Sequence, residues 1–263
     1  MVLWNPAAHD LEGVPLADIL HHDADTRRAA LLAFTAAAGR EAAFRAGADD
    51  YLTKPFDAQE LVARIDGVLR RRDAALTASP MTSLPGGRVI DREVERRLDA
   101  RIPFALSYVD LDNLKAYNDT YGYAKADGVV LQTAGILRDA VARLGGEGAF
   151  LGHVGGDDFV ILTAPDRAGR VCAEVVAAFD RVIPLYYDKV DRERGSIEAV
   201  DRFGEKRSFP LLSISIATVN APPGRFTRHA DLARTAAELK DRAKRVKGSV
   251  HLSEDSPAFV GTP

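Results

Sequence analysis

The sequence is poor in the features that mark secreted, membrane-bound or nucleic-acid-binding proteins. It has one cysteine in 263 residues, Cys172, so no internal disulfide can form and a reducing compartment is expected. No stretch approaches the roughly 20 apolar residues of a membrane-spanning helix. The net charge of −3 gives no electrostatic reason to expect nucleic acid or an anionic membrane as partner. We therefore expect a soluble cytoplasmic protein, with Cys172 buried in an apolar helix.

A first segment is predicted over residues 1–73. It alternates apolar stretches of strand length with amphipathic helical patterns, which indicates α/β structure with a parallel sheet. The predicted elements are a helix over 14–22, a strand over 29–35, a helix over 40–47, a strand over 51–53 and a final helix that Asp57 caps and that ends at Asp73. The small, polar stretch 74–80 is interpreted as a linker.

A second domain is predicted over residues 81–254, followed by a tail over 255–263. Its elements are a helix over 89–101, a strand over 104–109, a helix over 128–144, a β-hairpin over 149–163, a helix over 168–182, a strand over 211–219 and a helix over 231–246. This order predicts an α/β sandwich with a mixed sheet. The charged stretch 184–209, here called the polar excursion, is expected to be a solvated two-stranded hairpin, with a partner-binding surface as the alternative.

Two acidic turns stand out in this second domain. Asp110 and Asp112 follow its first strand, and Asp157 and Asp158 lie in the turn of the hairpin. If the hairpin and the first strand are neighbours, the carboxylates meet at one edge of the sheet. With no basic residue beside them in sequence they repel one another, and a hard divalent cation such as Mg²⁺ or Mn²⁺ would relieve this. The alternative is a set of ordinary solvated turn residues.

Three motifs around these aspartates resemble those of the GGDEF family, the diguanylate cyclases. Residues 110–122 (DLDNLKAYNDTYG) follow the pattern DxDxFKxxND-yG, residues 155–159 (GGDDF) stand at the signature loop, and residues 81–85 (MTSLP) look like the LTxL opening. The motifs occur in the family's order and span about 79–250. The resemblance implies a nucleotidyl-cyclase-like α/β sandwich in which two domains, each with one GTP, face one another and form cyclic di-GMP.

Carried over by position, the resemblance also implies a site. Asp110, Asp157 and the carbonyl of Leu111 would hold Mg²⁺ or Mn²⁺, and Asp157, Asp158 and Lys115 would be catalytic. A metal held there can bind the α-phosphate and lower the pKa of an attacking 3′-hydroxyl. Asn118 and Asp127 would bind the guanine edge. The implied nucleotide-binding residues are Asn113, Leu114, Lys115, Asn118, Asp127 and Lys244.

The sequence departs from the family pattern at several of its functional positions. Asp158 stands where the family has Glu, and Gly248 stands where it has a phosphate-binding Arg, for which Lys247 is a candidate substitute. Ser79 replaces an Asp at the domain entrance, and His153 replaces the Arg before the signature loop. The further departures are the stretch 123–127 (YAKAD) in place of HxxGD, and Gly146 and Ala149 in place of the inhibitory RxxD.

Residues 46–56 (AGADDYLTKPF) resemble the last strand and loop of response-regulator receivers. Thr35 matches their switch residue, and Gly13 falls on the glycine before their third helix. Asn5 falls on their phospho-acceptor Asp, and the first two receiver strands are missing. We interpret the segment as either a receiver cut short at Met1, a pseudo-receiver for dimerisation through an exposed sheet edge, or a poorly ordered remnant.

Three functions therefore compete at the level of sequence. The first is a diguanylate cyclase acting as a homodimer with GTP and a divalent metal. The second is a weak or inactive GGDEF domain that senses GTP or a related purine nucleotide and regulates a signalling partner. The third is a dimerisation module in a signalling complex, with the polar excursion as partner surface.

Overall fold

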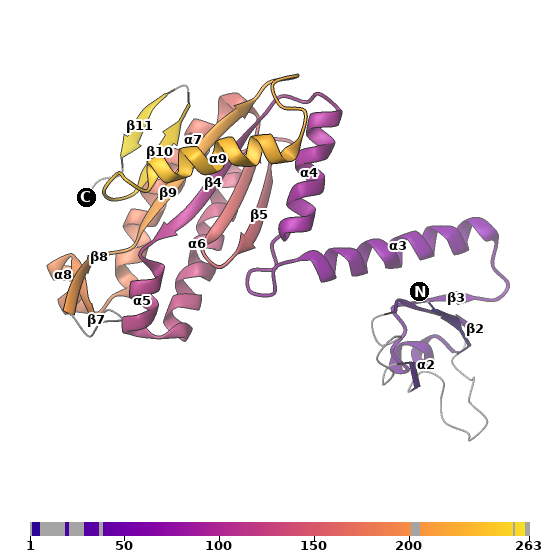
Figure 1. Ribbon diagram of the computed structural model, residues 1–263. Helices are drawn as coiled ribbons and strands as arrows, with labels where there is room; N and C mark the ends of the chain where they lie inside the picture. The colour runs from indigo at the N-terminus through magenta and orange to yellow at the C-terminus, as the bar shows by residue number, and fades with distance from the viewer. Residues whose placement is uncertain are drawn as a thin grey trace. The chain divides into compact units, whose positions relative to one another are not determined.

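The computed structural model describes residues 2–5, 19–20, 29–36, 39–200, 206–254 and 256–260 (Figure 1). The chain divides into two compact units, Met1–Leu76 and Thr77–Pro263. Their boundary falls inside the predicted linker 74–80. Over the described ranges, no helix has both the length and the apolar character needed to cross a membrane.

The first unit contains a parallel sheet, as predicted, and its three strands have the order β1-β2-β3, of which β1 was not predicted. The strands are β1 (Val2–Trp4), β2 (Leu31–Thr35) and β3 (Asp50–Thr53), and the helices are α2 (Arg40–Arg45) and α3 (Ala58–Thr77). Asn5 and Lys54 directly follow β1 and β3, and Thr35 ends β2, so all three lie at the carboxyl edge of the sheet. Most of the helix expected over 14–22, and Gly13, lie outside the described residues; residues 19–20 are helical.

Helix α3 begins where the sequence predicts and ends later. The backbone N–H of Glu60 donates to Asp57 Oδ1 at 2.7 Å, which confirms Asp57 as the cap. The helix then continues past Asp73 to Thr77, through part of the predicted linker. Ala74, Ala75 and Leu76 have high helix propensity, so the stretch has no physical reason to end a helix.

The second unit is built on a six-stranded sheet in the order β11-β10-β9-β4-β6-β5. The strands are β4 (Phe104–Asp112), β5 (Phe150–Gly155), β6 (Asp158–Thr163), β9 (Ser213–Ala221), β10 (Val250–Ser253) and β11 (Ser256–Val260). β9 and β10 are parallel and the other neighbours are antiparallel, so the predicted mixed sheet is confirmed. β10 was not predicted, and β11 lies in the predicted tail 255–263.

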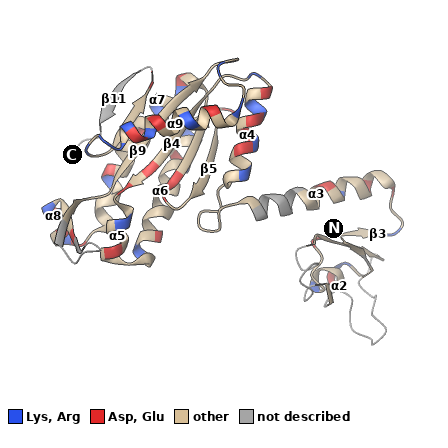
Figure 2. Ribbon diagram, in the orientation of Figure 1, with Lys and Arg blue, Asp and Glu red and all other residues tan. Residues whose placement is uncertain are grey.

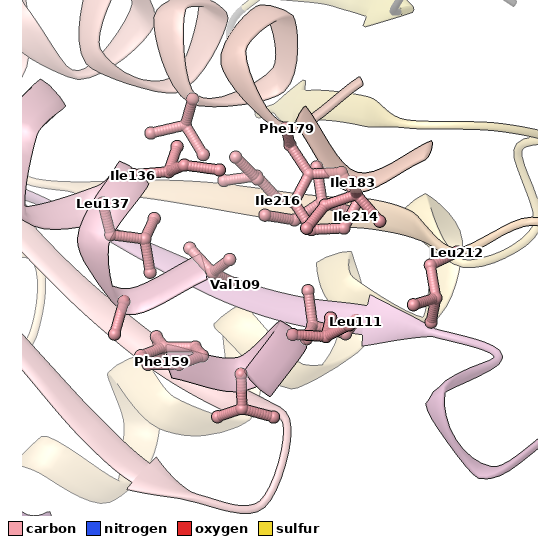
Figure 3. Packing of buried hydrophobic residues seen from close by; sticks show 14 of the residues in the cluster. Val109, Leu111, Ile136, Leu137, Phe159, Phe179, Ile183, Leu212, Ile214 and Ile216 are labelled. Atoms are coloured by element: carbon pink, nitrogen blue, oxygen red, sulfur yellow. The ribbon is translucent and has the colours of Figure 1, made fainter. Parts of the chain in front are cut away.

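Helices cover both faces of this sheet and form two cores. They are α4 (Gly87–Asp99), α5 (Leu114–Tyr121), α6 (Tyr123–Leu144), α7 (Pro165–Val182) and α9 (His229–Ala243). On one face the sheet packs against α4 and α9 through Phe104, Leu106 and Leu162. On the other, Val109 and Phe159 lie against Leu137 of α6 (Figure 3). Alternate residues of β4 and β6 thus belong to different cores.

Strand β4 extends through both aspartates that the sequence analysis placed in a turn. It pairs with β9 from Phe104 to Asp112 and with β6 from Ala105 to Asp110, with Asp110 opposite Asp158 and Asp112 opposite Ser213. The turn prediction for Asp110 and Asp112 is therefore wrong. The strand continues through Asp112 because β9 still pairs with it there. The two carboxylates are tolerated because polar groups from other elements contact them.

The polar excursion consists of a β-hairpin and of short helical turns that pack against α5. It contains the 3₁₀ turn η2 (Ile183–Tyr186), α8 (Lys189–Arg194) and the antiparallel pair β7 (Ser196–Val200) and β8 (Lys206–Pro210), so the two-stranded prediction is confirmed. Its base is not solvated. The Tyr117 hydroxyl donates to the carbonyl of Tyr186 at 2.8 Å, and Tyr121 donates to Asp191, which fixes the excursion against α5.

A buried polar chain links β4, β9 and β10 beneath α7. Ser107 Oγ lies 2.7 Å from Thr218 Oγ1, which lies 2.9 Å from His251 Nε2. Cys172 Sγ donates to Ser107 Oγ at 3.4 Å and is fully buried, as predicted. Burial disfavours the charged imidazole and lowers the pKa of His251 to about 4.

Acid is expected to weaken this unit through His251. The pKa of His251 is about 6.5 in the unfolded chain and about 4 in the folded chain. Between these pH values the imidazole is therefore protonated in the unfolded chain and neutral in the folded one. Between pH 7 and pH 5 the free energy of unfolding should fall by about 2 kcal/mol from this group alone. Urea unfolding at both pH values measures the fall. In His251→Gln the fall should be smaller by that amount; an equal fall in both proteins would contradict the assignment.

Candidate nucleotide and metal site

The sheet brings Asp110 and Asp158 together at the end of the β4–β6 ladder. They occupy directly opposite positions on the two strands, and Asp110 is only 3% exposed. Asp157 precedes β6 in the hairpin turn, where Gly155 and Gly156 have φ of 148° and 59°. These positive φ values favour glycine, which is why a Gly-Gly turn can present Asp157 beside the strand ends. The predicted meeting of the two acidic pairs is confirmed.

Two lysines that are distant in sequence contact these carboxylates. Lys240 belongs to α9 and Lys244 directly follows it. Lys240 Nζ lies 3.2 Å from Asp110 Oδ2 and 3.2 Å from Asp158 Oδ1. Lys244 Nζ lies 2.6 Å from Asp110 Oδ1, close enough for an ion pair but without hydrogen-bond geometry. The sequence analysis predicted Lys244 as a site residue and missed Lys240. No basic residue adjoins the carboxylates in sequence, but two lysines distant in sequence contact them in the structure. Figure 2 marks the charged residues along α9 and β4.

A signal for Lys240 does exist in the sequence. Ala236, Leu239 and Ala243 form the buried stripe of α9, and Lys240 follows Ala236 at the i+4 spacing of that same stripe. A lysine on the buried side of a helix that packs on a sheet needs an acidic partner. Lys240 and Lys244 are also four residues apart, so the helix presents both ammonium groups toward one place.

The acidic groups keep perturbed pKa values despite these lysines. Burial raises the pKa of Asp158 to about 6, the neighbouring Asp110 carboxyl adds to the rise, and Lys240 opposes it. Burial also raises the pKa of Asp112, against hydrogen bonds from Ser213 and Ser215 to its Oδ2. Each shift disfavours the carboxylate, and burial is its largest cause in both residues.

Two adjoining hollows open beside the acidic residues. The larger, of about 660 Å³, lies between the start of α5 and the chain after α9; its lining residues include Leu111, Asp112, Asn113, Leu114, Lys115, Asp157, Ser213, Lys244, Arg245, Lys247 and Gly248. The smaller, of about 350 Å³, is lined by Met81, Leu114, Lys115, Asn118, Tyr123, Ala126, Asp127, Val130, Gly156 and Asp157. Leu114, Lys115 and Asp157 belong to both, so the hollows meet at the start of α5.

The predicted site residues separate by role between these hollows. The two residues expected to read the base, Asn118 and Asp127, line the smaller one. The other predicted contacts, Asn113, Leu114, Lys115 and Lys244, line the larger one. Asn118 Oδ1 is buried without a hydrogen-bond partner, whereas Asp127 is exposed. The structure thus brings the predicted residues to one region, and their roles remain predictions.

The residues present fit a divalent cation that shares its coordination with a substrate. In the described part of the chain, no three His, Cys, Asp or Glu side chains lie close enough to hold a metal alone. Magnesium usually takes one or two carboxylates and completes its shell with water and phosphate oxygens. Asp110 Oδ1 is a buried carboxylate oxygen without a hydrogen bond, and its one ion-pair partner among the described residues is the partly exposed Lys244, so it could also serve as a ligand for such a cation.

Two departures from the family pattern are partners in the structure. Ser79 Oγ lies 2.7 Å from His153 Nδ1, and Thr82 Oγ1 lies 3.0 Å from the same nitrogen. His153 Nε2 lies 3.1 Å from the carbonyl of Gly156, so Nε2 carries the proton and Nδ1 accepts from the hydroxyls. Burial lowers the pKa of His153, which favours this neutral form. The domain entrance is thereby joined to the signature loop.

Curated relatives resemble a limited part of the chain. The transcriptional regulatory protein PrrA of Mycobacterium leprae is 43% identical over 82 residues, which are 31% of this chain and 35% of PrrA. The heme response regulator HssR of Staphylococcus haemolyticus is 44% identical over 61 residues, which are 23% of this chain and 27% of HssR. The chain thus matches only about a third of these relatives' length.

Similar solved structures include two from Pseudomonas aeruginosa. The GGDEF domain of TpbB, also called YfiN, is 24% identical with a TM-score of 0.47, covering 68% of this chain and 94% of its own. The diguanylate cyclase SiaD, in complex with its activator SiaC, is 22% identical with a TM-score of 0.49, covering 74% of this chain and 70% of its own. Residues 78–186 match the family model described as diguanylate cyclase, GGDEF domain. Residues 78–186 therefore belong to a GGDEF domain, and the N-terminal region is a partial receiver-like segment similar to response regulators.

Proposed function

We propose that the second unit binds GTP with Mg²⁺ or Mn²⁺ and, as a homodimer, condenses two GTP molecules to cyclic di-GMP and two pyrophosphates. The observation that carries this proposal is the pair of hollows that meet at Lys115 and Asp157. Asn118 and Asp127 line the smaller hollow among mostly apolar residues, whereas Lys244, Arg245 and Lys247 line only the larger one, and the two hollows share the start of a helix. A nucleoside triphosphate has the same division between base and phosphates.

The smaller hollow suits the Watson–Crick edge of guanine. A buried amide oxygen without a partner costs about 1–3 kcal/mol, and a ligand that donates to Asn118 Oδ1 would recover it. The Asp127 carboxylate is also an acceptor. Guanine offers two adjacent donors, its ring N–H and its amino group, whereas adenine offers only an amino group on that edge. Two acceptors therefore favour guanine.

The larger hollow suits the phosphates. Lys115, Lys244, Arg245 and Lys247 all line it. Asn113 has φ of 65°, and no side chain caps the helix that starts at Leu114, so the first N–H groups of α5 remain available to an anion. Arg245 and Lys247 supply positive charge on the side where Gly248 replaces the family's arginine.

Asp110, Asp157 and the Leu111 carbonyl would hold the metal ion. When bound, that ion would neutralise charge on the α-phosphate and make the attacking 3′-hydroxyl more acidic. The protein's own residues would fix the base through Asn118 and Asp127 and the phosphates through Lys115 and Lys244. One copy of these hollows would hold one GTP, so a product made from two would require two copies facing one another.

Incubation of the purified chain with GTP and Mg²⁺ or Mn²⁺, followed by liquid chromatography, tests the proposal. We expect cyclic di-GMP from the wild type and little from Asn118→Ala, which removes an acceptor from the base pocket. A GTP-induced rise in melting temperature should weaken in the same variant, because a ligand stabilises the state it binds. No melting shift with any purine nucleotide would remove the proposal and leave the dimerisation module.

A nucleotide sensor without turnover is the second candidate, and one contact favours it. Lys240 engages both Asp110 and Asp158, so the carboxylate at the family's glutamate position is paired within the protein. Under this alternative GTP would raise the melting temperature, the rise would be lost in Asn118→Ala, and no cyclic di-GMP would form at protein concentrations that allow dimerisation.

A further inference from the structure

Lys240 occupies an enclosed position at the acidic end of the central strands. Its side chain is 17% exposed, and its Nζ is equidistant, at 3.2 Å, from one oxygen of Asp110 and one of Asp158. The same Nζ lies 4.4 Å from the centre of the Tyr108 ring, whose face attracts cations. Two carboxylates and an aromatic face thus surround one ammonium group.

The neighbouring lysine has a different environment. Lys244 is 39% exposed, its Nζ lies 2.6 Å from Asp110 Oδ1, and it lines the larger hollow. Its ammonium group can turn toward a phosphate while Lys240 still pairs with both Asp110 and Asp158. Lys240 does not line either hollow, so its charge is committed to the two carboxylates.

The place that Lys240 fills is one that a divalent ion would otherwise take. Asp110 and Asp158 are directly opposite on paired strands, and their side chains share one face of the sheet. Two carboxylates so close repel each other unless a proton, a metal ion or an ammonium group lies between them. A metal ion bridging the two oxygens would have to lie where the ammonium group now does, and two cations cannot share that position.

We propose that the Lys240 ammonium is a resident cation that takes the place of a divalent metal ion between Asp110 and Asp158. The inference rests on the proposed function only in treating this edge of the sheet as one that attracts divalent ions. It predicts that the chain binds one divalent ion fewer than its carboxylates would bind without Lys240. The number of bound ions would then depend on this lysine of α9. Lys240 is a positioning residue here, because it acts through the two carboxylates.

Titration of the full chain with Mn²⁺ tests this, with free Mn²⁺ followed by electron paramagnetic resonance and no nucleotide present. Lys240→Met should bind one Mn²⁺ per chain more than the wild type, and Lys240→Arg, which keeps the charge, should bind the wild-type number. The double variant Lys240→Met with Asp158→Asn should lose the added ion. Lys189→Met, an equal charge change at a 78% exposed lysine of α8, is the control and should match the wild type.

Equal Mn²⁺ numbers in the wild type and Lys240→Met overturn the inference. Should Lys240→Met unfold without metal, refolding by Mn²⁺ but not by NaCl of equal ionic strength supports it, and no refolding overturns it. The proposed function is followed separately by the GTP-induced melting shift and product formation in the wild type. If the Mn²⁺ numbers are equal but the wild type shows the GTP-induced melting shift and forms product, the inference is overturned and the proposed function stands. If Lys240→Met binds an added ion but the wild type shows neither the shift nor product, the inference is supported and the proposed function is not.

Discussion

Asp157→Asn is expected to lower cyclic di-GMP formation by on the order of 10³-fold while leaving the free energy of unfolding unchanged within about 0.5 kcal/mol. The carboxylate lines both hollows and lies where base and phosphates would meet. The neutral amide keeps its shape and removes its charge, so electrostatic stabilisation of phosphoryl transfer is lost. Within the described ranges Asp157 forms no ion pair or side-chain hydrogen bond, so folding does not depend on it.

Initial rates by liquid chromatography and urea unfolding of the same preparations measure the two effects. Asp241→Asn is the control, because Asp241 is exposed on α9 and the substitution makes the same change of charge. Both the rate and the stability of the control should equal those of the wild type. A rate for Asp157→Asn within tenfold of the wild type would remove Asp157 from the chemistry, whatever the product.

The sequence located the acidic site because its parts are local. Asp110 follows an apolar strand, Asp157 and Asp158 lie in a tight hairpin, and a hairpin strand commonly pairs with a nearby strand of the same sheet. The error was one of extent. The ladder of β4 continues through Asp112, which accepts hydrogen bonds from Ser213 and Ser215, and partners about a hundred residues away leave no trace in the local pattern.

Lys240 shows why the counter-charges could not be found in the same way. It contacts Asp110 across a sequence separation of 130 residues. Sequence reasoning asked whether basic residues adjoin the acidic turns, and the answer depends instead on which face of the sheet α9 covers. The sequence indicated only that Lys240 lies on the buried side of α9. It did not indicate which acidic residues the lysine contacts.

The same limit applies to Ser79 and His153. Taken along the sequence, each is a separate departure from the family pattern. In the structure the serine hydroxyl and the imidazole are hydrogen-bonded, and the imidazole bonds the carbonyl of Gly156 in the signature loop. The two departures thus form one hydrogen-bonded unit in this chain, whereas Gly248 lies among the cations that line the larger hollow.

Gly86→Ala is expected to lower the free energy of unfolding of the second unit by about 3 kcal/mol. A Cβ at this position would lie 2.4 Å from the carbonyl oxygen of Thr77, a backbone atom that cannot move aside as a side chain can. The Gly86 N–H donates to that same oxygen at 2.8 Å, so relieving the clash would also cost the hydrogen bond that closes the entrance turn.

The adjacent glycine provides the control. Gly87 begins α4, and a Cβ there would meet no atom within 4 Å, so Gly87→Ala should leave stability unchanged or raise it by up to about 1 kcal/mol. Urea unfolding of both variants separates steric conflict from the general effect of replacing glycine. Equal free energies of unfolding for Gly86→Ala and Gly87→Ala would show that the backbone of the entrance turn can shift at little cost. A large loss at Gly86 alone would make that turn a rigid support for the signature loop, because the carbonyl of Pro85 accepts the backbone N–H of His153 at 2.8 Å.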